Sequence, residues 1–283
     1  MQSKNPVFAR SAEFNGKGGV ATATSPSQWQ IDLNGEGPPT HTGSGTGRMT
    51  IESVVEKTAI TLGVLIAAAA VAWLMVGNLG AGTFDDPVDN SALQTAYTLT
   101  LVGGLGGFAL SMVNSFKRSV SPALVLLYAA VEGLFVGAFS KIVSTYVGGD
   151  PSIVFGAILG TMAAFAGTLF AYKFFNIQVN DRFRKVVVAS MFGFVAVSLL
   201  DFVLSLFNNS FGFNGFSTMG LISSFIGVII AVFMLILDFD YVEKGIAAGI
   251  PERESWRAAF GLTVTIVWLY IEMLRILAIL NRN

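Results

Sequence analysis

The sequence predicts an all-α membrane protein, a bundle of seven transmembrane helices behind a polar N-terminal tail. Hydrophobic residues make up 53% of the chain and charged residues only 12%, about half the roughly 25% of a soluble domain. Seven segments reach the roughly 17–25 apolar residues that a helix needs to cross a bilayer. A chain with so few charges cannot present an ordinary wet surface, so we expect lipid to cover it.

The seven predicted spans follow one another with short joins. In chain order they cover residues 58–77, 93–114, 120–140, 151–172, 186–207, 219–239 and 257–280. The joins carry residues typical of turns and of membrane surfaces. They are the acidic run Asp85 to Asp89, Lys117-Arg118, Gly148-Gly149-Asp150-Pro151, the basic stretch 173–185, the uncharged segment Asn208 to Gly215, and Gly249-Ile250-Pro251-Glu252. Pro151 suits the start of a span, because the first turn of a helix leaves its N–H groups unpaired in any case.

The first fifty residues differ from the rest of the chain. They are rich in Gly, Ser, Thr, Asn and Pro, and no apolar run follows the basic residues Lys4, Arg10 and Lys17, so no signal peptide is expected. Such a composition cannot bury enough apolar surface to fold. The sequence therefore predicts a disordered cytoplasmic tail over residues 1–50 and a transmembrane domain over residues 51–283.

The basic residues of the short joins predict the orientation. Eleven fall on the side of the N-terminus: Arg48, Lys57, Lys117, Arg118, Lys173, Arg182, Arg184, Lys185, Lys244, Arg253 and Arg257. Two, Lys141 and Arg282, fall on the other side. Because Lys and Arg gather in cytoplasmic loops, the N-terminus is expected inside and the C-terminus outside.

Small residues punctuate two of the spans. Gly103-Gly104-Leu105-Gly106-Gly107 interrupts the second span, and Gly156, Gly160 and Ala164 recur at a spacing of four in the fourth. Small residues at this spacing let helix backbones approach closely in lipid. The pattern favours tight helix packing, and it also suits a second helix that bends.

Residue content excludes several kinds of chemistry. The chain has no cysteine, and its one histidine, His41, lies in the tail, so thiolate and histidine chemistry are excluded from the spans. No nucleophile and base are paired, and no Gly-x-Gly-Asp surrounds the buried acids, so an enzyme is not expected. Residues 257–280 contain no lysine, which excludes a retinal photoreceptor. The net charge of −1 gives no reason to expect nucleic acid.

Five ionisable residues lie inside the apolar segments. They are Glu132, Asp201, Asp238, Glu272 and Arg275. Each costs about 2.5–3.5 kcal/mol to insert, so such residues usually mark function. Four carboxylates and one arginine cannot all stay ionised without partners, which is the chemistry of a proton sensor, a proton relay or a cation path. Structural roles stay open for single residues, with Glu132 as a hydrogen-bond hub and Glu272–Arg275 as an inert pair.

Helix rise sorts these residues into two levels. The first level, near the cytoplasm, contains Asp238, Asp240 and Thr265. The second, central to outer, contains Glu132, Asp201, Glu272 and Arg275. Glu272 and Arg275 are three residues apart on one helix, so they are expected to pair.

Three sequence motifs carry a resemblance to a known family. They are Tyr128-Ala129-Ala130-Val131-Glu132-Gly133-Leu134, Leu237-Asp238-Phe239-Asp240-Tyr241-Val242-Glu243-Lys244, and the last span from Ala259-Phe260-Gly261-Leu262 to Leu274-Arg275-Ile276-Leu277. In this order, over residues 55–283, the chain resembles the Bax inhibitor-1 family, also called the transmembrane Bax inhibitor motif family. The polar tail, with Lys4-Asn5-Pro6-Val7-Phe8, is similar to the branch found in actinobacteria.

The resemblance implies a fold and an activity. It implies a seven-helix bundle whose last helix is surrounded by the other six, and a pH-sensitive calcium leak. In the family, two aspartates on the sixth and seventh helices share a proton and close the cytoplasmic side. Asp238 matches the first aspartate, whereas Thr265 stands where the second is expected. The sequence therefore predicts an Asp–hydroxyl pair, with Asp240 as a neighbour that could partly replace the missing carboxylate.

The resemblance also implies a basic latch at the cytoplasmic end of the second helix. Ser115 occupies the first position of that basic run, and Lys117 and Arg118 follow it. Protonation of Asp238 is expected to change such a latch and so to shift an open–closed equilibrium.

Together these inferences predict a pH-sensitive calcium leak channel of the bacterial inner membrane. Asp238, Asp240 and Thr265 form its expected gate, Lys117 and Arg118 its latch, and the expected ion path contains Glu132, Asp201, Glu272 and Arg275. Its expected partners are the bilayer, calcium and protons, without a cofactor. Two alternatives stay open: a proton-coupled cation transporter or exchanger, and a membrane stress or interaction protein that transports nothing.

Overall fold

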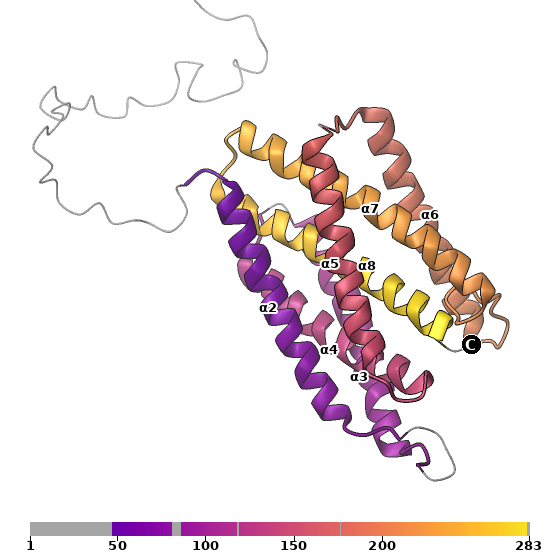
Figure 1. Ribbon diagram of the computed structural model, residues 1–283. Helices are drawn as coiled ribbons and strands as arrows, with labels where there is room; N and C mark the ends of the chain where they lie inside the picture. The colour runs from indigo at the N-terminus through magenta and orange to yellow at the C-terminus, as the bar shows by residue number, and fades with distance from the viewer. Residues whose placement is uncertain (1–46, 81–85, 118, 176, 282–283) are drawn as a thin grey trace, which may run out of the picture. The chain divides into compact units, whose positions relative to one another are not determined.

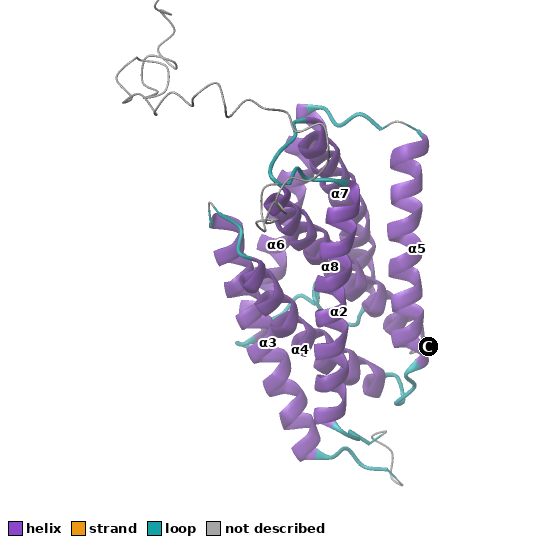
Figure 2. Ribbon diagram, turned by 90° about the vertical axis from the view of Figure 1, so that its left-hand side faces the viewer, coloured by secondary structure: helices purple, strands orange, loops and turns teal. Residues whose placement is uncertain are grey.

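The computed structural model describes residues 47–80, 86–117, 119–175 and 177–281. All of the predicted tail except residues 47–50, and Arg118 of the predicted latch, lie outside the described residues. Figures 1 and 2 show the helices of the described part from two sides.

Within the part of the chain that the structure describes, seven helices are long and apolar enough to cross a membrane, which confirms the predicted multi-pass architecture. Their bounds are α2 Ile51–Val76, α3 Asn90–Phe116, α4 Pro122–Tyr146, α5 Ser152–Phe174, α6 Asp181–Ser205, α7 Thr218–Ala247 and α8 Ser255–Asn281, with the short 3₁₀ helix η2 at Glu252–Glu254. Most helices extend a turn or more beyond the predicted spans. Polar first and last turns, such as the one that holds Glu52, continue a helix past the apolar run on which the prediction was based.

Side-chain caps begin several of these helices. Thr50 and Ser53 form a capping box at the start of α2, and Asn180 accepts a hydrogen bond from the Phe183 amide at the start of α6. At α3, the Ser91 hydroxyl and backbone amide donate to the Asp89 carboxylate and lower its pKa below the ordinary value. These caps fix the residue at which each of the three helices begins.

The last helix, α8, is the centre of the bundle, as the sequence resemblance implied. In its most apolar stretch 67% of the residues are buried, against 17–44% in the other six spans. It packs against α2, α4, α5 and α7 along its length. Side chains of the outer helices α3 and α6 reach it at Phe260, which packs near Leu110, and at Trp268, whose ring lies 5.5 Å from that of Phe194. Both views show α8 enclosed by the other helices (Figures 1 and 2).

Glycines set the closest helix approaches. At Gly137 of α4 an added Cβ would overlap the backbone carbonyl of Ala69 in α2, and at Gly103 of α3 it would lie 2.7 Å from the Phe135 amide nitrogen of α4. In α5, Gly156 and Gly160 face Leu277 and Met273 of α8. The predicted small-residue packing is therefore present in both spans, and it brings α2 and α3 against α4 and α5 against α8.

Gly137→Ala is expected to lower the free energy of unfolding by about 1–3 kcal/mol, because the new methyl group meets rigid helix backbone. The matched control is Gly63→Ala in α2, where an added Cβ has no atom within 4 Å. The control should be neutral or slightly stabilising, since alanine favours helix more than glycine does. Thermal unfolding of the detergent-solubilised variants measures both changes, and equal midpoints would contradict the packing account.

The bundle has two ends, because consecutive helices run in opposite directions. We call the end at which α2, α4, α6 and α8 begin the basic end, and the other the distal end. At the basic end, the Met49 amide donates to Ile250 O (2.9 Å) and the Glu252 amide to Gly47 O (2.8 Å). Lys57 Nζ lies 2.6 Å from Glu252 Oε1. These bonds fasten the linker between α7 and α8 to the start of α2. Figure 1 shows the backbone of the linker beside the start of α2.

Candidate functional site

Asp238 and Thr265 meet at the basic end, between α7 and α8. Thr265 Oγ1 donates to Asp238 Oδ2 over 2.7 Å, and it also lies 3.1 Å from Gly261 O in the preceding turn. Thr265 is buried and Asp238 is partly buried. The predicted Asp–hydroxyl pair is therefore present, and it ties the central helix to its neighbour.

The Asp238 carboxylate borders a cavity of about 290 Å³. Its lining joins the end of α3 to the facing parts of α7 and α8: Asn114, Ser115, Asp238, Tyr241, Arg257, Ala258, Phe260 and Gly261. Asn114 is fixed in place, because its side-chain amide donates to Leu110 O (3.1 Å) and Leu124 O (3.2 Å). On one side the Asp238 carboxylate therefore borders the cavity, whose lining includes polar side chains. On the other side it bonds to Thr265 at the contact between α7 and α8.

Arg257 lines this cavity and connects two of the segments around it. Its Nε donates to Glu254 Oε2 (2.7 Å), and its Nη2 donates to the Lys117 carbonyl (3.4 Å) at the end of α3. The Lys117 side chain is exposed. The contact between the end of α3 and α8 thus uses the Lys117 backbone, and Arg257 is the cation that sequence reasoning did not place here. Arg118, the other predicted latch residue, lies outside the described residues, so the latch stays a prediction.

Asp240 lies in a separate cluster at the same end. Its buried carboxylate binds Arg184 Nη2 of α6 (2.9 Å) and Lys244 Nζ (2.8 Å). Nearby, the Tyr172 hydroxyl of α5 donates to the Glu243 carboxylate. The structure therefore joins Asp240 to α6 through its ion pair with Arg184, while Asp238 faces Thr265. The expected role of Asp240 beside the gate stays a prediction.

Glu272 and Arg275 form a buried ion pair on the distal half of α8, as their spacing predicted. Arg275 Nη1 lies 3.0 Å from Glu272 Oε2, and the residues are 5% and 3% exposed. Trp268 Nε1 donates to the other Glu272 oxygen over 3.3 Å. Gly227 of α7 makes room for the carboxylate, since a Cβ there would lie 2.8 Å from Glu272 Cδ. The sequence signal for this contact was a glycine inside an apolar span, which sequence reasoning missed.

Arg275 also binds the loop between α6 and α7. Its Nη2 donates to Phe213 O (2.7 Å) and lies 3.3 Å from the Ser223 hydroxyl. The buried carboxylate of Asp201 accepts from the amides of the same loop: Phe211 (2.9 Å), Gly212 (3.2 Å) and Asn214 (2.8 Å). Asp201 and Arg275 therefore hold the loop from two sides. These contacts give Asp201 the position of a loop anchor.

Glu132 lies between α3 and α4. Its carboxylate occupies the space that the missing side chain of Gly107 leaves open, so a Cβ at Gly107 would overlap it. Glu132 is partly buried and lies one turn from the buried Tyr128. The structure thus places Glu132 at a helix pair other than the α7–α8 contact, and its role in an ion path stays a prediction.

An apolar layer separates the two polar levels of α8. Thr265 and Glu272 are seven residues apart, about 10 Å along the helix. Between them Ile266, Leu269 and Tyr270 are buried. Within the described residues no group of three or more acidic or histidine side chains is arranged to hold a metal ion. The two polar levels of α8 are thus separated by buried side chains.

Comparison with known proteins identifies the family. The sequence model of the family described as Bax inhibitor 1 like matches residues 5–282. No curated protein matches the chain. The match covers nearly the whole chain, and the fold has the seven spans and the central last helix that the three motifs implied. The chain is thus a multi-pass membrane protein that belongs to the Bax inhibitor-1-like family.

Proposed function

We propose that this protein is a pH-sensitive calcium leak channel of the bacterial inner membrane. The observation that carries the proposal is the Asp238 carboxylate, which lies within a transmembrane bundle, bonds to the central helix and borders a partly polar cavity. An ionisable group inside a transmembrane bundle costs free energy to insert into the membrane, and such groups usually take part in the movement of ions or protons. The cavity supplies a route by which water and protons reach the acid.

Protonation of Asp238 removes a negative charge from the contact between α7 and α8. The Thr265 hydroxyl can donate to a carboxylate, but a protonated carboxyl is itself a donor and favours a different hydrogen-bond arrangement. The two protonation states therefore stabilise two packings of α8 to different degrees. A proton shifts the equilibrium between them, which is how a local charge change operates a gate.

In this proposal, the described arrangement is the closed state of the channel. Buried apolar side chains fill α8 between the Asp238 and Glu272 levels, and the α6–α7 loop covers the distal end through its bonds to Asp201 and Arg275. Opening requires α8 to move relative to α7, so that cations pass from Glu272 to Asp238. Asp201 and Arg275 then act on the path by holding the distal loop.

The basic end faces the cytoplasm in this proposal. Of the basic residues of the joins, those named above for the N-terminal side that the structure describes lie at or near this end, and Lys141 lies towards the other. The positive-inside rule assigns such an end to the cytoplasm. Asp238 then senses cytoplasmic pH.

Calcium flux into proteoliposomes tests the proposal. Full-length protein is reconstituted with a calcium indicator inside the vesicles, and calcium entry is followed over a series of external and internal pH values. We expect entry that protein-free vesicles lack and whose rate depends on pH at the basic end. Vesicles that admit no calcium at any pH would overturn the channel and favour a protein that transports nothing.

A second indicator separates a leak from an exchanger. A pH-sensitive dye in the same vesicles reports whether protons leave as calcium enters. A leak lets calcium follow its own gradient with no fixed proton ratio once the membrane potential is clamped. Proton movement in constant proportion to calcium would instead support the proton-coupled exchanger.

A further inference from the structure

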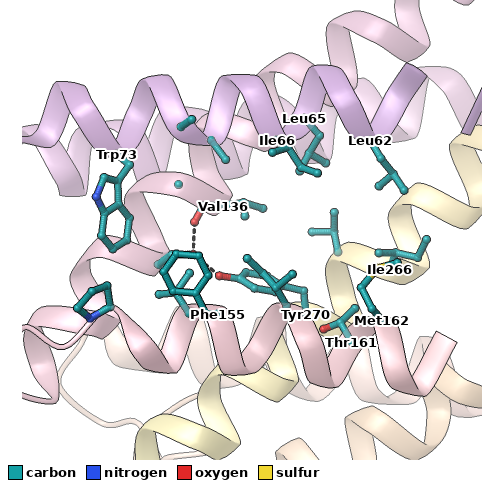
Figure 3. A pocket seen from close by; sticks show the side chains of 18 of the residues that line it. Leu62, Leu65, Ile66, Trp73, Val136, Phe155, Thr161, Met162, Ile266 and Tyr270 are labelled. Carbon is teal, nitrogen blue, oxygen red and sulfur yellow. Dashed lines mark hydrogen bonds between the residues drawn. The ribbon is translucent and has the colours of Figure 1, made fainter. Parts of the chain in front are cut away.

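A long apolar groove lies between α2 and α5. Its volume is about 530 Å³, within the roughly 300–1,000 Å³ of typical ligand pockets. Figure 3 shows side chains of α2 and α5 on its two sides, with Ile266 and Tyr270 of α8 between them. The floor is buried and includes Leu65, Val136 and Val267. Tyr270 at the floor is already satisfied, because its hydroxyl lies 2.7 Å from that of Ser140.

The groove opens on the surface that faces the membrane. Its rim residues are exposed although they belong to membrane-spanning helices: Ile66 65%, Leu74 77% and Phe155 64%. Helices α2 and α5 each pack against α4 and α8. Hydrocarbon, and not water, is therefore the solvent at the rim.

The length of the groove matches one leaflet of the bilayer. It runs from Leu62 to Leu74 on α2, a rise of twelve residue steps, and from Pro151, just before α5, to Met162 within it, a rise of eleven steps. At 1.5 Å per residue these are about 18 Å and 17 Å. One leaflet of hydrocarbon is about 15 Å thick, half of the roughly 30 Å core.

A cation and an aromatic ring mark the distal mouth. Trp73 lines the groove there, and Lys141 Nζ lies 4.4 Å from the centre of its ring. On the α5 side Asp150 is engaged locally, because its carboxylate accepts from the amide (2.8 Å) and hydroxyl of Ser152. Tryptophan and lysine at this depth are typical of the level of lipid headgroups.

We propose that this groove binds one acyl chain of a glycerophospholipid from the leaflet at the distal end, with the lipid phosphate beside Lys141. The apolar walls match a hydrocarbon chain, the length matches a leaflet, and the ammonium matches the phosphate in sign. Such a lipid would touch Ile266 and Val267, which directly follow Thr265 in α8. The proposal does not depend on calcium transport.

Photo-crosslinking in proteoliposomes tests the site. The probe is a phosphatidylethanolamine with a diazirine on one acyl chain, and labelled peptides of the full-length protein are mapped by mass spectrometry. We expect adducts concentrated on residues 62–74 and 151–162. Ala70→Phe, at the exposed rim, should fill the groove and reduce these adducts severalfold. Ala67→Phe is the matched control, because Ala67 is exposed on the same helix outside the groove lining.

A second comparison tests the phosphate contact. Lys141→Gln should lower phosphatidylethanolamine labelling about fivefold, while Lys141→Arg retains it. Diacylglycerol with the same reactive chain lacks the phosphate, so its labelling should not respond to Lys141→Gln. This comparison also detects a merely structural effect of the substitution, because such an effect would lower the labelling by both lipids equally. Adducts spread evenly over all lipid-facing helices, equal effects of Ala70→Phe and Ala67→Phe, or no selective effect of Lys141→Gln would overturn the proposal.

Discussion

Arg275→Met is expected to lower the free energy of unfolding by about 3–5 kcal/mol, because it leaves the Glu272 carboxylate buried without its cation. The substitution also removes the donor to Phe213 O that holds the α6–α7 loop. Unfolding of the detergent-solubilised protein, followed by tryptophan fluorescence as denaturant is added, measures the loss. Lys185→Met, at an exposed position of α6, is the control and should change stability little.

The double variant Glu272→Gln/Arg275→Met separates charge from packing. It removes the uncompensated carboxylate, so it should recover part of the stability that Arg275→Met loses. Glu272→Gln alone should cost less than Arg275→Met, since Arg275 keeps its carbonyl acceptor in the loop. If Arg275→Met were no more destabilising than Lys185→Met, the ion pair would not hold the distal end together.

Asp238→Asn is expected to remove the pH dependence of calcium flux. Asparagine is uncharged at every pH, as the protonated carboxyl is, so the variant should stay at the flux that the wild type reaches at its acid limit. Proteoliposome flux over the same pH series measures this. The prediction holds whether acid opens or closes the channel, because it states the calcium flux of the variant only relative to the flux of the wild type at its acid limit.

Asp240→Asn is the matched control for this prediction. It removes a carboxylate two residues from Asp238. That carboxylate forms ion pairs with Arg184 and Lys244 in a cluster separate from the Asp238–Thr265 pair. The control should keep a pH-dependent flux. A variant Asp238→Asn that follows the wild-type pH profile, together with an Asp240→Asn variant that loses it, would move the sensor to Asp240.

The sequence predicted local relationships well. Spacing of three along one helix was enough to pair Glu272 with Arg275, because both side chains project from the same helix face. The pair of Asp238 with Thr265 was predicted from the resemblance and from equal depth in adjoining helices. The first prediction relied only on the geometry of one helix, whereas the second also needed the resemblance to bring two helices together.

Contacts between helices distant in sequence were not predictable in the same way. Asp240 pairs with Arg184 of α6, and Asp201 accepts three amides of a loop ten or more residues away. The partner depends on how each helix is rotated about its axis, and no local pattern sets that rotation. The role of Gly227 was not predictable for the same reason, because it depends on the Glu272 carboxylate of another helix that packs against it.

The sequence by itself determined the number of spans, their order, their helical form and the family. These features follow from the cost of exposing polar backbone to lipid and from the length of each apolar run. Tertiary structure decided which buried acids meet which partners, where the cavity and the groove open, and that Asp201 anchors a loop. Those outcomes depend on the rotation and close approach of packed helices. Glycine positions permit the close approach, but the arrangement becomes defined only when the other six helices pack around α8.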